Sequence, residues 1–299
     1  MSWRDANKNG MRISYFFKDT KPFGQLVGLF VLLLVCFVLA AGLQLAVPAG
    51  DGASGIRMEL VMQGVSQLLI FLLPVVLFAV LFRERAGQFL GFCSFRWWQP
   101  LLAMLILLLL MPAIDWLTKW NDGWDLGRIG ERLRAVTAAS EAVVERMLSL
   151  TGAGDFVLQL LVVALVPAVC EELFFRGGVQ QIFKEWFGNG HVAVIVTAFV
   201  FSVAHGDVYG LVPRFTMGLL LGYLFLYTGS IVVNICAHFL NNAVIVVMYY
   251  LYHRGTIAFN PSEQMMLPWH VVAMCGVGAL LLFWLYYLKK PSDDSHKSL

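Results

Sequence analysis

Long apolar runs that few charged residues interrupt constrain this chain more than any other feature. A helix needs about 20 apolar residues to span the hydrocarbon core of a bilayer. Eight runs come close to that length, with expected bounds of 25–47, 58–82, 100–118, 156–176, 191–205, 211–228, 231–252 and 268–288. Only 13% of the residues are charged, against about 25% in soluble domains. We therefore predict an all-α, polytopic integral membrane protein with about eight transmembrane helices.

The remaining composition excludes several partners and cofactors. The net charge of +2 is too small to indicate nucleic-acid binding. The five cysteines are odd in number, widely scattered and mostly within apolar runs, so we interpret them as buried hydrophobic residues. They predict neither a disulfide framework nor a zinc knuckle. The expected partner of most of the surface is the lipid bilayer.

The basic residues predict the orientation, because cytoplasmic loops carry an excess of Lys and Arg. With eight crossings both termini lie on one side, and that side holds 13 basic residues against 8 on the other. Five of those eight belong to the segment 119–153, and without it the split is 13 to 3. We expect both termini to be cytoplasmic. We also expect the first span to be retained, because the polar tail before it is long for a signal peptide.

The segment 119–153 is the longest polar stretch, and it predicts an amphipathic helix with apolar residues near helical spacing. Such a helix is expected at the membrane interface, as a passive connector or as a lid over a site. The chain then divides into a tail at 1–24, three spans in 25–118, this loop, a core at 154–253, and a last span with its tail at 254–299.

Polar side chains gather in the later spans, where they are costly and mark function by default. The first group comprises Glu171, Glu172 and Arg176. Glu172 and Arg176 are four residues apart and can pair on a helix. Glu171 points about 100° away from Glu172 and lacks that partner. The alternative for this group is a salt-bridge cluster at the end of a span.

Two further groups follow on later apolar segments. Phe201 and His205 are one turn apart near the end of a span. His238 and Asn242 are one turn apart inside the seventh span, and Asn234 lies one turn earlier. The alternatives are a packing histidine and an asparagine that joins helices.

Two short turns are expected to bring these groups together. The turn 188–190 makes a hairpin in which Glu171 and His205 lie at similar heights, about 24–27 Å from the turn. The helix carrying Glu171 must then continue to about residue 186. The turn 228–230 starts the helix of the third group, whose imidazole and carboxamide lie about 12 Å and 18 Å along it. A carboxylate, two imidazoles and a carboxamide would converge inside the bilayer.

This set of side chains suits hydrolysis. A carboxylate in a low-dielectric site can take a proton from water, and an imidazole can orient that water. An imidazole and a carboxamide can donate hydrogen bonds to an oxyanion. The sequence has no Gly-x-Ser-x-Gly elbow and no His-Glu-x-x-His zinc helix. Glu171, His205 and His238 would nevertheless supply three ligands to a catalytic zinc.

In their order along the chain, the three groups resemble the motifs of the CPBP family, the CAAX proteases and bacteriocin-processing enzymes. The family patterns are Glu-Glu-x-x-x-Arg, Phe-x-x-x-His and His-x-x-x-Asn. They fall here at Glu171–Arg176, Phe201–His205 and His238–Asn242. The resemblance covers about 155–250, and the eight spans are similar to those of the prenyl-CAAX endopeptidase branch.

The resemblance implies an intramembrane endopeptidase that hydrolyses a peptide bond of a membrane-associated protein or peptide. It implies that Glu171 is the general base and that His205 positions the attacking water. It further implies that His238 and Asn242 form the oxyanion hole. We expect the protein to lie in a bacterial plasma membrane.

The resemblance also implies that Glu172 and Arg176 support the site structurally. The family is often called metalloprotease, whereas its mechanism is usually described as glutamate-dependent without metal. We expect no cofactor, and a zinc ion on the three ligands named above is the alternative. Two other functions stay open: a non-catalytic scaffold or bacteriocin-immunity protein, and a proton-coupled transporter. A transporter usually has paired halves, which this chain lacks.

We predict that cysteines introduced at Ser2 and Ser298 of a cysteine-free chain escape a membrane-impermeant thiol reagent in intact cells. The reason is the excess of basic residues on the side of both termini. Permeabilised cells are the control and should label both positions. Labelling of either position in intact cells contradicts the predicted orientation.

Overall fold

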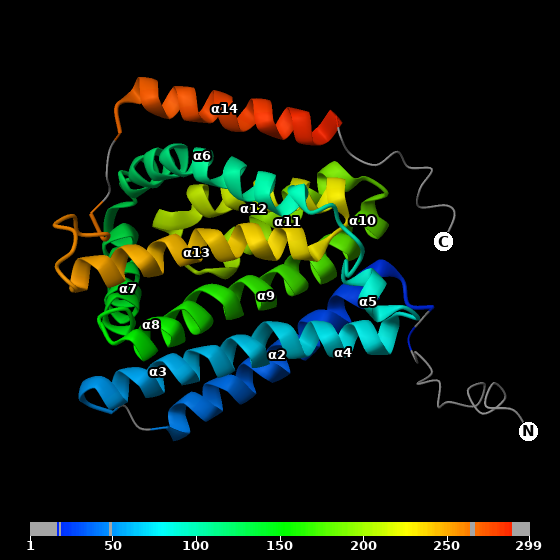
Figure 1. The fold of residues 1–299 in the computed structure, drawn as a ribbon. Coiled ribbons are helices and arrows are strands. Elements are labelled where there is room, and N and C mark those ends of the chain that lie inside the picture. The colour runs from blue at the N-terminus through cyan, green and yellow to red at the C-terminus, as the bar shows by residue number, and fades with distance from the viewer. Residues whose placement is uncertain (1–16, 18, 48–49, 264–266, 289–299) are drawn as a thin grey trace, which may run out of the picture.

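The computed structural model describes residues 17, 19–47, 50–263 and 267–288. The predicted tails therefore lie largely outside the described residues. Helices dominate the described part of the chain, and no strand occurs in it. The long helices run side by side, and α7 lies across one end of the bundle (Figure 1). The prediction of an all-α membrane protein is confirmed.

Two spans form the N-terminal part of the bundle. The first is α2 (Pro22–Ala46). The second joins α3 (Gly52–Gln67) to α4 (Leu73–Phe82) through the π-helical turn Leu68–Leu72, and it is 31 residues long. Many of their exposed side chains are large and apolar, as a surface in contact with lipid requires.

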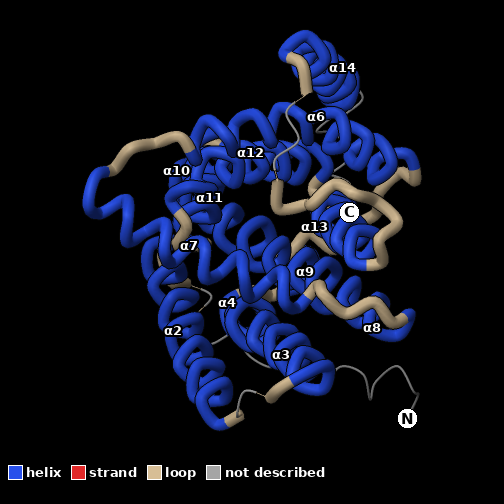
Figure 2. Tube along the Cα trace, turned by 90° about the vertical axis from the view of Figure 1, so that its left-hand side faces the viewer, coloured by secondary structure: helices blue, strands red, loops and turns tan. Residues whose placement is uncertain are grey.

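The next helices lead to the polar end of the molecule. The short α5 (Ala86–Phe89) precedes α6 (Trp98–Asp122), and α6 packs against both α13 and α14 (Trp269–Leu288). The predicted amphipathic helix is α7 (Gly127–Met147). Figure 2, which looks toward the α7 end, shows α7 crossing in front of the bundle.

The fourth span is one helix of 35 residues, Ala153–Phe187. It consists of α8 (Ala153–Gln159), a π-helical segment (Leu160–Leu165), α9 (Val166–Glu172), a second π-helical segment, η3 (Leu173–Gln180), and α10 (Gln181–Phe187). π-Helical turns are rare and often occur at functional sites. Here η3 directly follows the two adjacent glutamates.

The predicted end of this span at residue 176 is wrong, because the helix continues to Phe187. The continuation to about residue 186 that the hairpin argument required is confirmed. Arg176 consequently lies near the middle of a membrane span and is fully buried. It does not belong to a cytoplasmic loop, so 12 basic residues remain on the side predicted to be cytoplasmic. The predicted asymmetry survives this correction.

Both predicted turns are present and have a clear local cause. Gly188 and Gly229 adopt left-handed φ angles of +62° and +66°, which glycine tolerates best. Asn189 caps the following helix, because its side-chain oxygen accepts hydrogen bonds from the backbone N–H groups of His191 and Val192.

The last part of the core contains α11 (Gly190–Ala204), the 3₁₀ turn η4 (Val208–Gly210), α12 (Leu211–Thr228) and α13 (Ile231–His253). Close packing of α11 against α12 depends on Gly218, where an added methyl group would come within 3.0 Å of Ala198. Within the described residues, seven helices are long and apolar enough to cross a membrane. The fifth of the eight predicted spans corresponds to α11, which is apolar but has only 15 residues.

Candidate active site

The Glu172 carboxylate is the centre of a buried hydrogen-bond cluster. Its Oε1 accepts hydrogen bonds from the Arg176 guanidinium at 2.7 Å and from His238 Nδ1 at 2.8 Å. Its Oε2 accepts a hydrogen bond from the Asn234 amide at 3.1 Å. The side chains of Glu172 and Arg176 are both completely buried. The predicted ion pair between them is therefore present, and Glu172 also accepts hydrogen bonds from two side chains of α13.

Arg176 extends the same cluster to two other helices. Its guanidinium donates a hydrogen bond to the Gly218 carbonyl of α12 at 3.3 Å. It also lies over the Phe201 ring of α11, 4.7 Å from the ring centroid. We call Glu172, Arg176, Asn234 and His238 the buried polar cluster. It connects the fourth span with α11, α12 and α13.

Glu171 points to a different neighbour, as the helical geometry predicted. Its Oε2 lies 3.9 Å from His205 Nε2 and 4.0 Å from His238 Nε2. Only 9% of its side chain is exposed. Both distances are longer than a direct hydrogen bond, and a small molecule such as water can bridge gaps of this size. The structure thus brings one carboxylate and two imidazoles together from three spans.

The hydrogen bonds of the two imidazoles determine where their protons lie. His205 Nδ1 is 2.8 Å from the Phe201 carbonyl oxygen, which only accepts hydrogen bonds, so Nδ1 must carry a proton. His238 Nδ1 likewise donates to the Glu172 carboxylate. In a neutral imidazole the other nitrogen is then an acceptor. In the neutral form, both Nε2 atoms therefore direct a lone pair toward Glu171. In an imidazolium, Nε2 instead carries a proton and donates.

Asn242 is held by a neighbour that the sequence motifs did not single out. Its side-chain Oδ1 accepts a hydrogen bond from the Asn241 amide at 3.1 Å. This assignment of the amide atoms leaves the Asn242 N–H groups free to donate to another acceptor.

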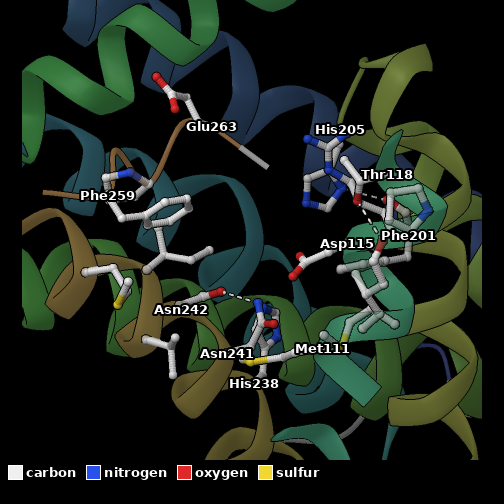
Figure 3. Close-up of a pocket in the computed structure, with 18 residues that line it drawn as sticks. Met111, Asp115, Thr118, Phe201, His205, His238, Asn241, Asn242, Phe259 and Glu263 are labelled. Atoms are coloured by element: carbon white, nitrogen blue, oxygen red, sulfur yellow. Dashed lines mark hydrogen bonds between the residues drawn. The ribbon is translucent and has the colours of Figure 1, made fainter. Parts of the chain in front are cut away.

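The imidazoles and asparagines line a cavity of about 600 Å³ between α6, α11, α12 and α13. Figure 3 shows His205, His238 and Asn242 around it, together with Asp115 and Thr118 of α6. Glu171 is not among its lining residues and lies behind the two histidines. The structure therefore places three of the four predicted catalytic side chains at the cavity wall and the fourth next to them.

The sequence analysis missed Asp115 as a cavity residue. Asp115 is an ionisable side chain inside a predicted span, three residues after Pro112, and this was the available signal.

The helix α7 is fastened across the end of the bundle close to this cavity. Thr137 donates a hydrogen bond to Asp207 at 2.8 Å, and Arg134 pairs with Asp122 at 2.7 Å. Arg134 also lies 4.0 Å from the centroid of the Tyr209 ring. The apolar side chains of Ile129 and Val136 are exposed, as expected for a helix at a membrane interface.

The side chains do not form a ready metal site. Across the described residues, no group of three His, Cys, Asp or Glu side chains is arranged to hold a metal ion. The nearest set is Glu171, His205 and His238, whose facing atoms are 3.9 and 4.0 Å apart.

Residues 153–244 match the family model of the type II CAAX prenyl endopeptidases, Rce1-like. The matched segment contains all three motifs, so the predicted resemblance to this family is confirmed for this part of the chain. The match supports a CAAX protease-type peptidase in general terms. No match was found among curated proteins or among solved structures.

The two adjacent glutamates allow a sharp test of the buried polar cluster. We predict that Arg176→Ala lowers the thermal stability in detergent strongly, because Glu172 would remain as a buried charge without its cation. Breaking such a pair typically costs about 3–5 kcal/mol.

The matched control is Glu171→Gln, which should melt within a few degrees of the wild type because Glu171 makes no direct hydrogen bond in the described structure. Thermal melting followed by tryptophan fluorescence measures both variants. Equal melting temperatures for Arg176→Ala and the wild type would contradict the role of the cluster.

Proposed function

We propose that this protein is an intramembrane endopeptidase that uses Glu171 to activate water for hydrolysis of a peptide bond. The observation that carries the proposal is the position of the Glu171 carboxylate about 4 Å from two imidazole Nε2 atoms, beside a cavity of about 600 Å³. The substrate is a membrane-associated protein or peptide, because the cavity lies among membrane-spanning helices.

In the proposed reaction, Glu171 and His205 hold one water molecule between them. The water donates one proton toward the Glu171 carboxylate and the other toward the lone pair of His205 Nε2. Its oxygen attacks the carbonyl carbon of the scissile bond while Glu171 takes the proton. The C–N bond then breaks, and Glu171 returns that proton to the departing amine. One water is consumed, and a carboxyl group and an amine are formed.

The oxyanion of the tetrahedral intermediate is stabilised by Asn242 and His238 in this proposal. Asn242 donates through its amide, whose oxygen is engaged by Asn241. His238 must be an imidazolium to donate through Nε2, because its Nδ1 proton is directed to Glu172. The two carboxylates, Arg176 and this imidazolium then sum to zero charge, which limits the cost of burying them.

The proposed mechanism uses no metal ion. We predict that purified active protein contains well under one zinc per chain by elemental analysis and stays active after prolonged chelation. A zinc ion would have to draw Glu171, His205 and His238 closer together than the 3.9 and 4.0 Å that separate their facing atoms. Stoichiometric zinc that disappears in both His205→Ala and His238→Ala would overturn the metal-free mechanism but keep the same residues as the site.

The function is tested by comparing new peptide N-termini in membrane fractions of cells that produce the wild type or a variant. We predict that Glu171→Gln abolishes cleavage, because the amide cannot take the proton. Asn242→Ala should slow cleavage by about 10²–10³, the usual cost of one oxyanion donor.

The control for Glu171→Gln is Glu131→Gln, the same substitution on the exposed face of α7, which should cleave like the wild type. Near-normal cleavage by Glu171→Gln would contradict the proposed mechanism. A non-catalytic scaffold would retain its cellular phenotype in Glu171→Gln.

A further inference from the structure

The cavity beside the proposed catalytic site contains a carboxylate that the proposed mechanism does not use. Asp115 lies on the face of α6 that also carries Met111, Ile114 and Thr118, and all four line the cavity. Its side chain is exposed to this space and points into it (Figure 3). Among the described residues it has no hydrogen-bond or ion-pair partner. An unpartnered ionisable group within a helix that is long and apolar enough to cross a membrane indicates a functional role.

The other charges of the cavity do not compensate Asp115. Glu263, in the loop between α13 and α14, also lines the cavity and has no side-chain partner in the described part of the chain. Arg214 is the one Lys or Arg among the described lining residues, and it is paired with Asp207 at 2.7 Å. The imidazolium proposed for His238 is balanced by Glu171, Glu172 and Arg176, so the uncompensated charge of the cavity wall is negative.

A second hollow of about 410 Å³ adjoins this cavity and shares Thr118, Pro213 and Arg214 with it. It lies under α7 and is lined by three more carboxylates, Asp122, Glu141 and Asp207.

Two of these carboxylates are neutralised by arginines, but Glu141 is paired with none of the described residues. Partial burial raises the pKa of Glu141, and the charges of Asp207 and Asp122 raise it further, as expected where the potential is negative. Clefts lined by one sign of charge attract ligands of the opposite sign.

We infer that the cavity selects a polypeptide segment with a positively charged side chain, a lysine or an arginine, and that Asp115 recognises this charge. The inference rests on the proposed peptidase function, and it specifies the substrate of that same site. The remaining wall contains Met111, Met217 and Met248, whose flexible apolar side chains can adapt to varied neighbours of the charged residue.

The same charges disfavour a substrate that places a free C-terminal carboxylate near Asp115. Two like charges in a partly desolvated cavity repel each other, and such a juxtaposition costs several kcal/mol. An internal, cationic segment therefore fits this cavity better than the last residues of a chain.

The test uses the purified full-length protein in nanodiscs and a set of ten-residue fluorogenic peptides rich in Ala and Leu. Each peptide is acetylated and amidated, and it carries one Lys, Gln or Glu, placed in turn at each central position. Its net charge is therefore +1, 0 or −1. Cleavage is measured as kcat/KM for the wild type and for Asp115→Asn. The control variant is Glu131→Gln, which lies outside both cavities. Binding is measured separately by fluorescence anisotropy on Glu171→Gln, with and without Asp115→Asn.

We expect the wild type to prefer the Lys peptide over the Gln peptide by about tenfold or more at one position, and to disfavour the Glu peptide. This Lys-to-Gln ratio should fall to near one in Asp115→Asn and stay unchanged in Glu131→Gln. Equal kcat/KM values for the three peptides, or a Lys preference that survives in Asp115→Asn, would overturn the inference.

The binding arm separates this inference from the proposed function. Selective binding of the Lys peptide that requires Asp115 supports the inference even when no peptide is cleaved, and the absence of cleavage then counts against the peptidase. Cleavage of all three peptides at equal rates supports the proposed peptidase function. It contradicts the proposed recognition of a cationic side chain by Asp115.

Discussion

The buried ion pair between Glu172 and Arg176 is the interaction on which the rest of the site depends. Removing two charges from water costs several kcal/mol per ion, and their attraction repays this only when hydrogen bonds satisfy the remaining polar atoms. Here most of those hydrogen bonds come from Asn234 and His238 of α13 and from the Gly218 carbonyl of α12, while Arg176 Nε has no partner among the described residues. The cost of burial is therefore offset only when the three spans are in register, which also positions the neighbouring Glu171.

Phe201 explains why an aromatic residue belongs to the second motif. Its ring packs against Arg176 on one side and lies 4.7 Å from the His205 ring and 6.3 Å from the His238 ring. Its carbonyl also fixes the His205 proton on Nδ1. The ring therefore lies between the fully buried Arg176 and the cavity, while its backbone orients one of the imidazoles that face Glu171. A smaller side chain would join these two environments and let water reach the ion pair.

The sequence predicted the elements whose cause is local. The length of the apolar runs predicted the spans, and Gly188 and Gly229 lie in the predicted turns. The four-residue spacing predicted the ion pair of Glu172 with Arg176. The bond from His238 to Glu172 joins residues 66 apart, and helical spacing carries no information on it. The cavity-facing position of Asp115 likewise depends on how α6 packs against α13. The predicted catalytic roles stay predictions that the proposed variants test.

The position of the cavity in the bundle restricts the route of a substrate. The described chain begins and ends at one end, where Phe23 contacts Trp186 and Tyr287 contacts Tyr227. His205 is two residues before Asp207, which Thr137 of α7 contacts, and the loop between α13 and α14 lies toward the same end (Figure 1). If the excess of basic residues places both termini in the cytoplasm, the acidic cavity faces the opposite side of the membrane. A cytosolic tail would then have to cross the bilayer to reach Glu171, whereas a membrane-embedded or exported cationic segment would reach it directly.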